Sequence, residues 1–94
     1  MEATQQVSVV TGGSGGLGLA IARYLAKRGD RIVLWDLDRH VAEKAAEFDG
    51  GLGLIVDVTD QASVARGFKE TIEKASGIAN LILSLIHISE PTRP

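Results

Sequence analysis

The 94-residue chain contains no cysteine. It therefore has no disulfide framework, no thiolate nucleophile and no sulfur-ligated metal. Its two histidines, His40 and His87, lie far apart in the sequence, and we expect no metal site. The lack of cysteine fits a reducing compartment, so we expect a cytoplasmic protein.

The chain also lacks a strong charge imbalance and a long apolar run. A net charge of −2 provides no basic surface for nucleic acid or an anionic membrane, and we expect neither as a partner. Residues 1–6 lack the basic start and apolar core of a signal peptide. The longest apolar run, Leu81–Ile88, is interrupted by Ser84 and His87 and is shorter than the roughly 20 residues that span a bilayer.

The chain does have a regular alternation of strand-like and helix-like patterns. The expected strands are residues 6–10, 31–36, 53–57 and 79–83, and the expected helices are residues 17–28, 39–48 and 60–76. Short connections between such elements favour right-handed crossovers and a parallel sheet. We therefore expect an α/β fold, an incomplete Rossmann-type, doubly wound parallel sheet with the strand order 3-2-1-4.

Apolar residues at helical spacing define the expected core face of each helix. On the first helix they are Leu17, Ile21, Tyr24 and Leu25. On the second they are Val41, Ala45 and Phe48, and on the third they are Val64, Phe68, Ile72 and Ala75. Trp35, in the second strand, is expected to pack in the core rather than to stack on a cofactor.

Five glycines between positions 12 and 18 join the first strand to the first helix. Such a loop presents backbone N–H groups at a helix N-terminus, where the partial positive charge favours an anion. Glycines permit positive φ angles and leave room for a pyrophosphate. The loop fits two patterns, G-x-G-x-x-G from Gly13 and T-G-x-x-x-G-x-G from Thr11. No Lys-Ser/Thr pair follows the glycines, which argues against a P-loop.

Asp36 ends the second expected strand, 24 residues after Gly12. A carboxylate in this place is positioned to accept hydrogen bonds from both ribose hydroxyls of a dinucleotide. The 2′-phosphate of NADP would bring a second anion close to it, so we expect NAD to be preferred, with NADP as the alternative. Arg39 is expected to be solvated; the alternative is that it pairs with a 2′-phosphate.

These residues resemble the short-chain dehydrogenase/reductase family. The resemblance rests on Thr11-Gly12-x-x-x-Gly16-x-Gly18, on Asp36 and on Asp57-Val58-Thr59-Asp60, and it covers residues 7 to about 84. It implies hydride transfer between a nicotinamide cofactor and an alcohol or carbonyl substrate. It also implies that the phosphates and the nicotinamide side of the cofactor lie against the loop residues Thr11, Gly12, Ser14, Gly16, Leu17 and Gly18.

The resemblance further implies that Asp36 holds the ribose, that Asp57 accepts from the adenine amino group and that the backbone of Val58 meets the adenine ring. The family's catalytic Tyr-x-x-x-Lys is absent. Tyr24 is the only tyrosine, and Arg28 stands at the fourth position after it. We therefore expect no catalytic residue in this chain and no hydride transfer by the chain alone.

Residues 85–94 depart from the family pattern, which continues from the fourth strand into an Asn-x-Ala-Gly turn. We expect a cofactor-binding domain over residues 1–84 and a non-native or disordered tail over residues 85–94. A frameshift, a read-through or an assembly artefact would produce such a tail. The alternative is a divergent but genuine tail.

Two other functions stay open. A non-catalytic dinucleotide-sensing module would keep the same fold and loop. A nucleotide-sugar epimerase or dehydratase of the family's extended branch usually has T-G-x-x-G-x-x-G, and the spacing here disfavours it. For the full-length enzyme the family implies a homodimer or homotetramer. These motifs do not specify the substrate or its stereochemistry.

Overall fold

Strands and helices alternate along the whole described part of the chain. The computed structural model describes residues 6–75 and 82–87, with side chains for residues 6–75. The strands are β1 (Gln6–Thr11), β2 (Arg31–Asp36), β3 (Leu52–Ile55) and β4 (Ile82–His87). The helices are α1 (Gly16–Lys27), α2 (Val41–Ala45) and α3 (Gln61–Ala75).

The strands form one parallel sheet in the order β3-β2-β1-β4. Val9 lies opposite Val33 of β2 on one side and opposite Leu85 of β4 on the other. The parallel α/β architecture and the order β3-β2-β1 confirm those parts of the prediction. Strand β4 extends to His87, so the domain boundary expected at Ser84 falls inside a strand. Residues 79–81, expected to open this strand, lie outside the described residues.

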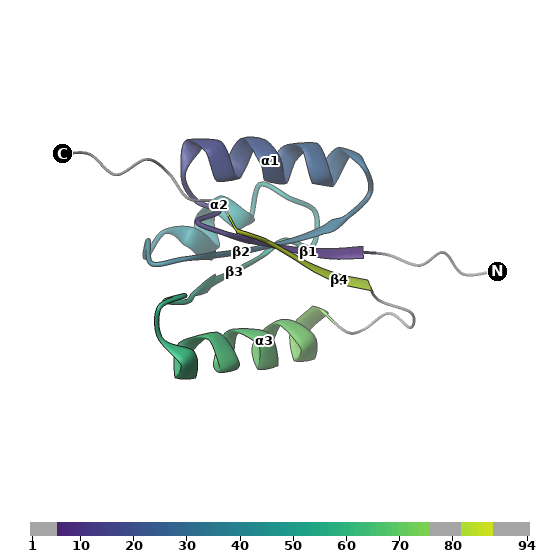
Figure 1. The fold of residues 1–94 in the computed structure, drawn as a ribbon. Coiled ribbons are helices and arrows are strands. Elements are labelled where there is room, and N and C mark those ends of the chain that lie inside the picture. Colours follow the sequence, from purple (N-terminus) through teal and green to yellow (C-terminus); the bar gives the residue numbers. More distant parts are fainter. Residues whose placement is uncertain (1–5, 76–81, 88–94) are drawn as a thin grey trace.

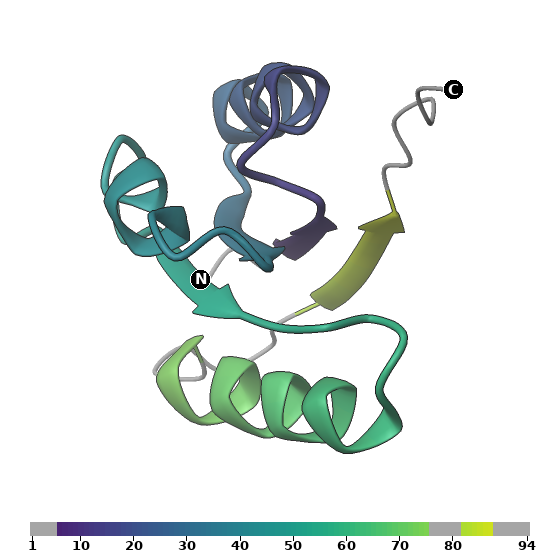
Figure 2. The same cartoon turned by 90° about the vertical axis from the view of Figure 1, so that its left-hand side faces the viewer.

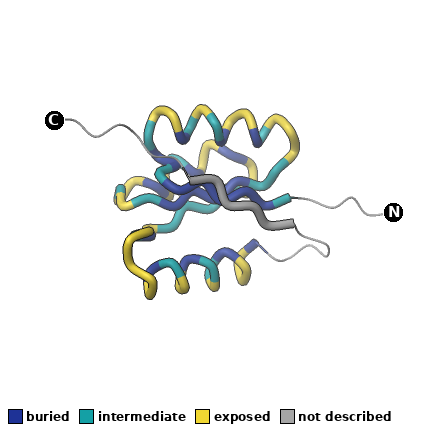
Figure 3. Tube along the Cα trace, in the orientation of Figure 1, coloured by how far each residue is buried: buried dark blue, intermediate teal, exposed yellow. Residues whose placement is uncertain are grey.

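Helices α1 and α2 cover one face of the sheet and α3 covers the other (Figures 1 and 2). This arrangement follows from the alternation of side chains along each strand. In β2, Ile32 and Leu34 belong to the core under α1 and α2, whereas Val33 and Trp35 belong to the core under α3. All four are buried, and Figure 3 shows β1 and β2 buried except at their ends.

The expected core face of α1 is correct in part, since Leu25 is buried and Ile21 packs against the core. The residues that α1 buries are Gly18, Ala22 and Leu25, whereas Leu17 and Tyr24 are 50% and 67% exposed. The helix is therefore rotated so that small residues meet the sheet. The close approach of α1 to the preceding loop explains the rotation, because a Cβ on Gly18 would lie 2.8 Å from the Cα of Gly13. Tyr24, expected in the core, is a surface residue.

The expected core face of α3 is also correct in part, since Ala75 is buried and Val64 and Phe68 pack against the core. Apart from Ala75, the buried residues are Ser63, Gly67 and Thr71, while Ile72 is 54% exposed. The large Trp35 side chain explains this choice of small residues. A Cβ on Gly67 would lie 3.1 Å from Cζ2 of Trp35, and Trp35 Nε1 donates a hydrogen bond to Thr71 Oγ1 at 3.3 Å. The prediction that Trp35 packs in the core is confirmed.

Helix α2 is shorter than the expected span of residues 39–48. After Ala45 the backbone tightens, and the N–H groups of Glu47 and Phe48 donate to the carbonyls three residues earlier. Such bonds are typical of a last turn that winds into a 3₁₀ geometry. Phe48 still packs in the core with Val41 and Ala45, so the expected apolar face is correct.

Within the described residues, no helix is both long and apolar enough to cross a membrane. The same residues contain no group of three or more His, Cys, Asp or Glu side chains arranged to hold a metal ion.

Candidate functional site

The glycine loop after β1 is fastened to the end of β2. The N–H groups of Gly12 and Gly13 both donate to the carbonyl oxygen of Trp35, at 2.8 and 3.3 Å. Gly12 has a φ of 71°, a conformation that glycine adopts without strain. The loop then enters α1 at Gly15, whose position as N-cap provides no side-chain hydrogen bond. The N-terminus of α1 therefore offers backbone donors without a side-chain acceptor of its own.

The glycines of the loop serve different steric needs. A Cβ on Gly18 would collide with the backbone of Gly12 and Gly13, so this glycine lets helix and loop touch. A Cβ on Gly16 would meet no atom within 4 Å, and Gly16 is exposed. Gly16 lies at the N-terminus of α1, which carries a partial positive charge. The open space beside it has room for an anion.

Asp36, at the end of β2, is bound to this loop. Its Oδ2 accepts hydrogen bonds from Ser14 N at 3.0 Å and from Ser14 Oγ at 2.6 Å, and its Oδ1 accepts from Asp38 N at 3.2 Å. Burial raises the pKa of Asp36, but the hydrogen bonds from Ser14 and from the Asp38 and Leu37 backbone outweigh it, and the net pKa lies below its usual value. Asp36 is therefore ionised at neutral pH and accepts hydrogen bonds.

A second carboxylate and a lysine extend this network. Ser14 Oγ lies 3.3 Å from Asp38 Oδ2, and Lys44 Nζ from α2 donates to Asp38 Oδ2 at 3.3 Å and to the Ser14 carbonyl at 3.0 Å. The pKa of Asp38 is lowered, mainly by the hydrogen bond from the backbone N–H of His40. Sequence reasoning missed Asp38 and Lys44, because their role depends on the approach of α2 to the loop.

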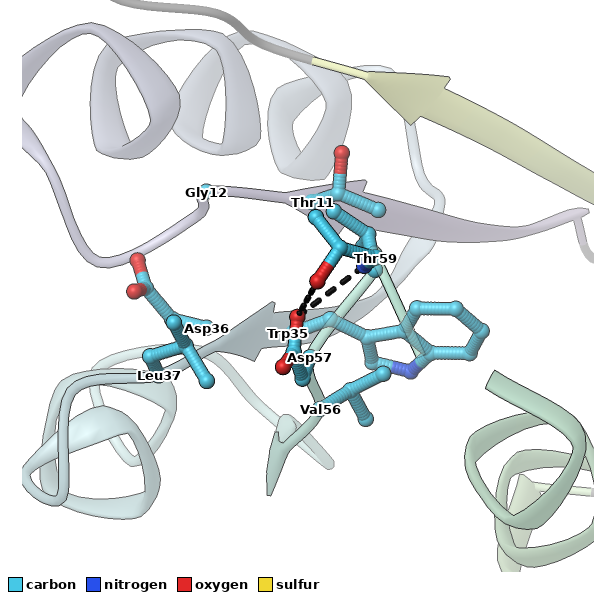
Figure 4. Close-up of a pocket in the computed structure, with 9 residues that line it drawn as sticks. Thr11, Gly12, Trp35, Asp36, Leu37, Val56, Asp57 and Thr59 are labelled. Atoms are coloured by element: carbon cyan, nitrogen blue, oxygen red, sulfur yellow. Dashed lines mark hydrogen bonds between the residues drawn. The ribbon is translucent and has the colours of Figure 1, made fainter. Parts of the chain in front are cut away.

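Asp57 follows β3 in a tight turn. Its Oδ1 accepts from the backbone N–H of Thr59 at 3.0 Å and from the Thr59 hydroxyl at 2.6 Å, both drawn in Figure 4. These bonds lower the pKa of Asp57. Both of these hydrogen bonds are accepted by Oδ1 of Asp57. Asp60 caps α3, because its Oδ1 accepts from Ala62 N at 3.1 Å.

A cavity of about 210 Å³ lies between Asp36 and Asp57 at the carboxyl edge of the sheet (Figure 4). Its lining combines the ends of three strands: Thr11, Gly12, Trp35, Asp36, Leu37, Val56, Asp57, Val58 and Thr59. The exposed side chains of Leu37 and Val58 give it an apolar rim. The volume is below the range of about 300–1,000 Å³ for drug-sized ligands, so the cavity suits one part of a dinucleotide, such as a base.

The structure brings most of the expected site residues together. Five of them, Thr11, Gly12, Asp36, Asp57 and Val58, line the cavity, and Ser14 contacts Asp36. Gly16, Leu17 and Gly18 lie at the start of α1 and do not line it. Leu37 was missed, because one apolar residue in a loop carries no periodic signal. Arg39 is exposed, as expected.

Comparison with known proteins agrees with this geometry. The family model of the short chain dehydrogenases matches residues 6–84. The chain is 37% identical over 87 residues to carbonyl reductase family member 4 of Danio rerio, covering 89% of this chain and 36% of that protein. It is 35% identical over 82 residues to the NADP-dependent (R)-specific alcohol dehydrogenase of Lentilactobacillus kefiri, covering 84% of this chain and 32% of that enzyme.

A solved structure shows the same fold. The 3-ketoacyl-(acyl-carrier-protein) reductase from Brucella melitensis, complexed with NADH, matches with a TM-score of 0.72 and 29% identity, over 83% of this chain and 33% of that one. The chain thus spans about a third of the length of the relatives that it matches. Family model, relatives and fold agree, and the chain belongs to the short-chain dehydrogenase/reductase family.

Proposed function

We propose that this chain is the cofactor-binding part of an NAD(P)-dependent oxidoreductase that transfers hydride between a nicotinamide and a small alcohol or carbonyl compound. The observation that carries the proposal is the cavity at the carboxyl edge of β1, β2 and β3, where Asp36 and Asp57 stand beside the glycine loop. In open parallel sheets this edge is the usual place for a nucleotide.

The residues present fit a dinucleotide. The open space at Gly16 and the start of α1 provide room and backbone donors for the pyrophosphate. Asp36, held ionised by Ser14, accepts from the ribose hydroxyls. Asp57 accepts from the adenine amino group, with Leu37 and Val58 supplying apolar contact to the ring.

The chemistry that the nicotinamide supplies when bound is hydride exchange with a substrate carbon. This chain's own residues bind and orient the cofactor. The sequence contains no Tyr-x-x-x-Lys, so we assign no proton transfer to any residue of this chain. In the whole enzyme we expect a homodimer or homotetramer in the cytoplasm. We keep the proposal that residues 85–94 are a non-native tail, although Leu85, Ile86 and His87 continue β4 in this structure.

We further propose that NAD is preferred over NADP. The ionised Asp36 would repel a 2′-phosphate that approaches the ribose position. Relatives of both kinds exist, since the Lentilactobacillus enzyme is NADP-dependent and the Brucella reductase is complexed with NADH. The preference therefore depends on this chain's own residues.

Isothermal titration of the purified chain with NAD and NADP tests both proposals. We expect saturable binding of NAD and weaker binding of NADP. Asp36→Ala should weaken NAD binding about ten- to 150-fold, because hydrogen bonds to a charged group contribute about 1.5–3 kcal/mol. Asp49→Ala, which changes an exposed acid outside the cavity, is the matched control. Failure of the chain to bind either dinucleotide would contradict the proposed function.

A further inference from the structure

The Ser14 network places one cation among the carboxylates next to the proposed ribose site. Lys44 Nζ donates to Asp38 Oδ2 and to the Ser14 carbonyl, and Ser14 Oγ in turn donates to Asp36. Lys44 is therefore connected to Asp36 through a single residue. Its side chain is 39% exposed, so it is partly open to solvent as well as paired with Asp38.

The two carboxylates differ in what they face. Asp36 lines the cavity, whereas Asp38 does not. Asp38 instead accepts from the backbone N–H of His40 at 2.9 Å through Oδ1 and from Lys44 through Oδ2. The side chain of Asp38 thus contacts Lys44, the start of α2 and the Ser14 hydroxyl, and its backbone N–H donates to Asp36.

This arrangement has an electrostatic consequence for a 2′-phosphate. Next to an ionised Asp36, such a phosphate would need a cation within a few ångströms to be tolerated. Among the described residues, Lys44 is the cation that contacts this network. Its charge is paired with Asp38, at an N–O distance of 3.3 Å.

We propose that Asp38 is a positioning residue for cofactor choice, which holds Lys44 away from the ribose 2′ position and so reinforces the preference for NAD. This inference rests on the proposed function and assigns part of its selectivity to a residue outside the cavity wall. Asp36 then repels the 2′-phosphate of NADP. Asp38 pairs with the Lys44 ammonium, which would otherwise attract that phosphate.

The decisive variant is Asp38→Asn. An asparagine keeps an oxygen acceptor for the backbone N–H of His40 and removes the charge that pairs with Lys44. We expect the affinity for NADP to rise about three- to fivefold, the size of an exposed ion pair, while the affinity for NAD changes less than about twofold. The readout is the ratio of the two dissociation constants, measured by calorimetry at low salt.

Two further variants separate this explanation from others. In a chain that already carries Lys44→Met, Asp38→Asn should no longer change the ratio of the NAD and NADP dissociation constants. The cation that Asp38→Asn would release is absent there. Glu43→Gln removes the same charge from a neighbouring residue of α2 whose carboxylate pairs with His40 and not with Lys44. It should leave the ratio unchanged, which distinguishes local pairing from net charge. Thermal unfolding of each variant verifies that it is folded.

The outcomes are distinct. An unchanged ratio in Asp38→Asn, an equal change in the Lys44→Met background or an equal effect of Glu43→Gln would each overturn the role of Asp38 while NAD binding stands. If the unmodified chain binds neither dinucleotide, the proposed function and this inference both fall. A ratio that shifts toward NADP only when both Lys44 is present and Asp38 is neutral supports the inference.

Discussion

The two faces of the sheet are packed in different ways. Under α1 and α2 the core is built from aliphatic side chains such as Ile32 and Leu34, with Phe48 at its edge. Under α3 it is built around Trp35, whose ring meets Phe68 edge-on with centroids 4.9 Å apart. The first face packs against two helices, and the second packs valines and the Trp35 indole against one helix.

The difference matters for how each face responds to change. An aliphatic core shared by many side chains tolerates the loss of a methyl group with a small cost in stability. A core centred on a single indole depends on the small residues that surround it, here Gly67 and Thr71. We therefore expect the loss of the Trp35 indole to cost more stability than the loss of a methyl group under α1 and α2.

The largest expected effect is that of Trp35→Ala. Removing this fully buried side chain should lower the free energy of unfolding by about 3–5 kcal/mol, because it deletes apolar contacts and leaves a cavity. Ile32→Val, on the other face, should cost about 0.5–1.5 kcal/mol. Urea denaturation measures both. Equal costs for the two variants would break the comparison.

Thr71→Val should be the next in size. The change is close to isosteric, but it leaves Trp35 Nε1 without its partner in the core, at a cost of about 1–3 kcal/mol. Ile72→Val, on the exposed side of the same helix, should stay within about 0.5 kcal/mol of the original stability. The same urea titration compares them, and a neutral Thr71→Val would show that the hydrogen bond adds nothing.

Gly67→Ala tests the close approach of α3 to Trp35. Alanine should favour the helix by about 1 kcal/mol, but overpacking costs about 1–3 kcal/mol, so we expect a net loss of up to about 2 kcal/mol. Gly16→Ala is the matched substitution on the other face, where a Cβ meets nothing. It should leave thermal stability unchanged and weaken NAD binding. A stabilised Gly67→Ala would contradict the steric argument.

The smallest effects concern the two carboxylates at the cavity, each held by a donor from a different loop. The lowered pKa of Asp36 stabilises the folded state above its ordinary pKa of 3.8, and this contribution is lost as the pH falls through the lower, folded value. Ser14→Ala should raise the pKa of Asp36 toward 3.8 and leave Asp57 unaffected. Thr59→Val should raise only that of Asp57. Carboxyl carbon NMR titration measures both, and a change at both sites in either variant would show that they are coupled.

The sequence predicted β1, β2, β3 and the glycine loop well, since continuous apolar runs and glycine spacing are local features. The fourth strand was expected over residues 79–83, whereas β4 spans Ile82–His87. It placed Leu25, Phe68 and Ala75 correctly but expected Leu17, Tyr24 and Ile72 in the core, where they are exposed. It also missed Gly18, Gly67 and Thr71, because hydrophobic periodicity gives no weight to residues that are buried for their small size or their hydrogen bond. Likewise, the contact of Lys44 with Asp38 and the loop joins residues that only the tertiary fold brings together.

Trp35 connects the glycine loop with α3. Its carbonyl oxygen accepts hydrogen bonds from the N–H groups of Gly12 and Gly13, and its ring packs beneath α3. It is also the sole tryptophan of the chain. Its fluorescence is therefore an intrinsic optical probe whose emission wavelength reports whether the indole is sheltered, and whose intensity is sensitive to a ligand entering the adjoining cavity. A single fluorescence titration thus follows ligand binding to the cavity and the folded state of the chain together.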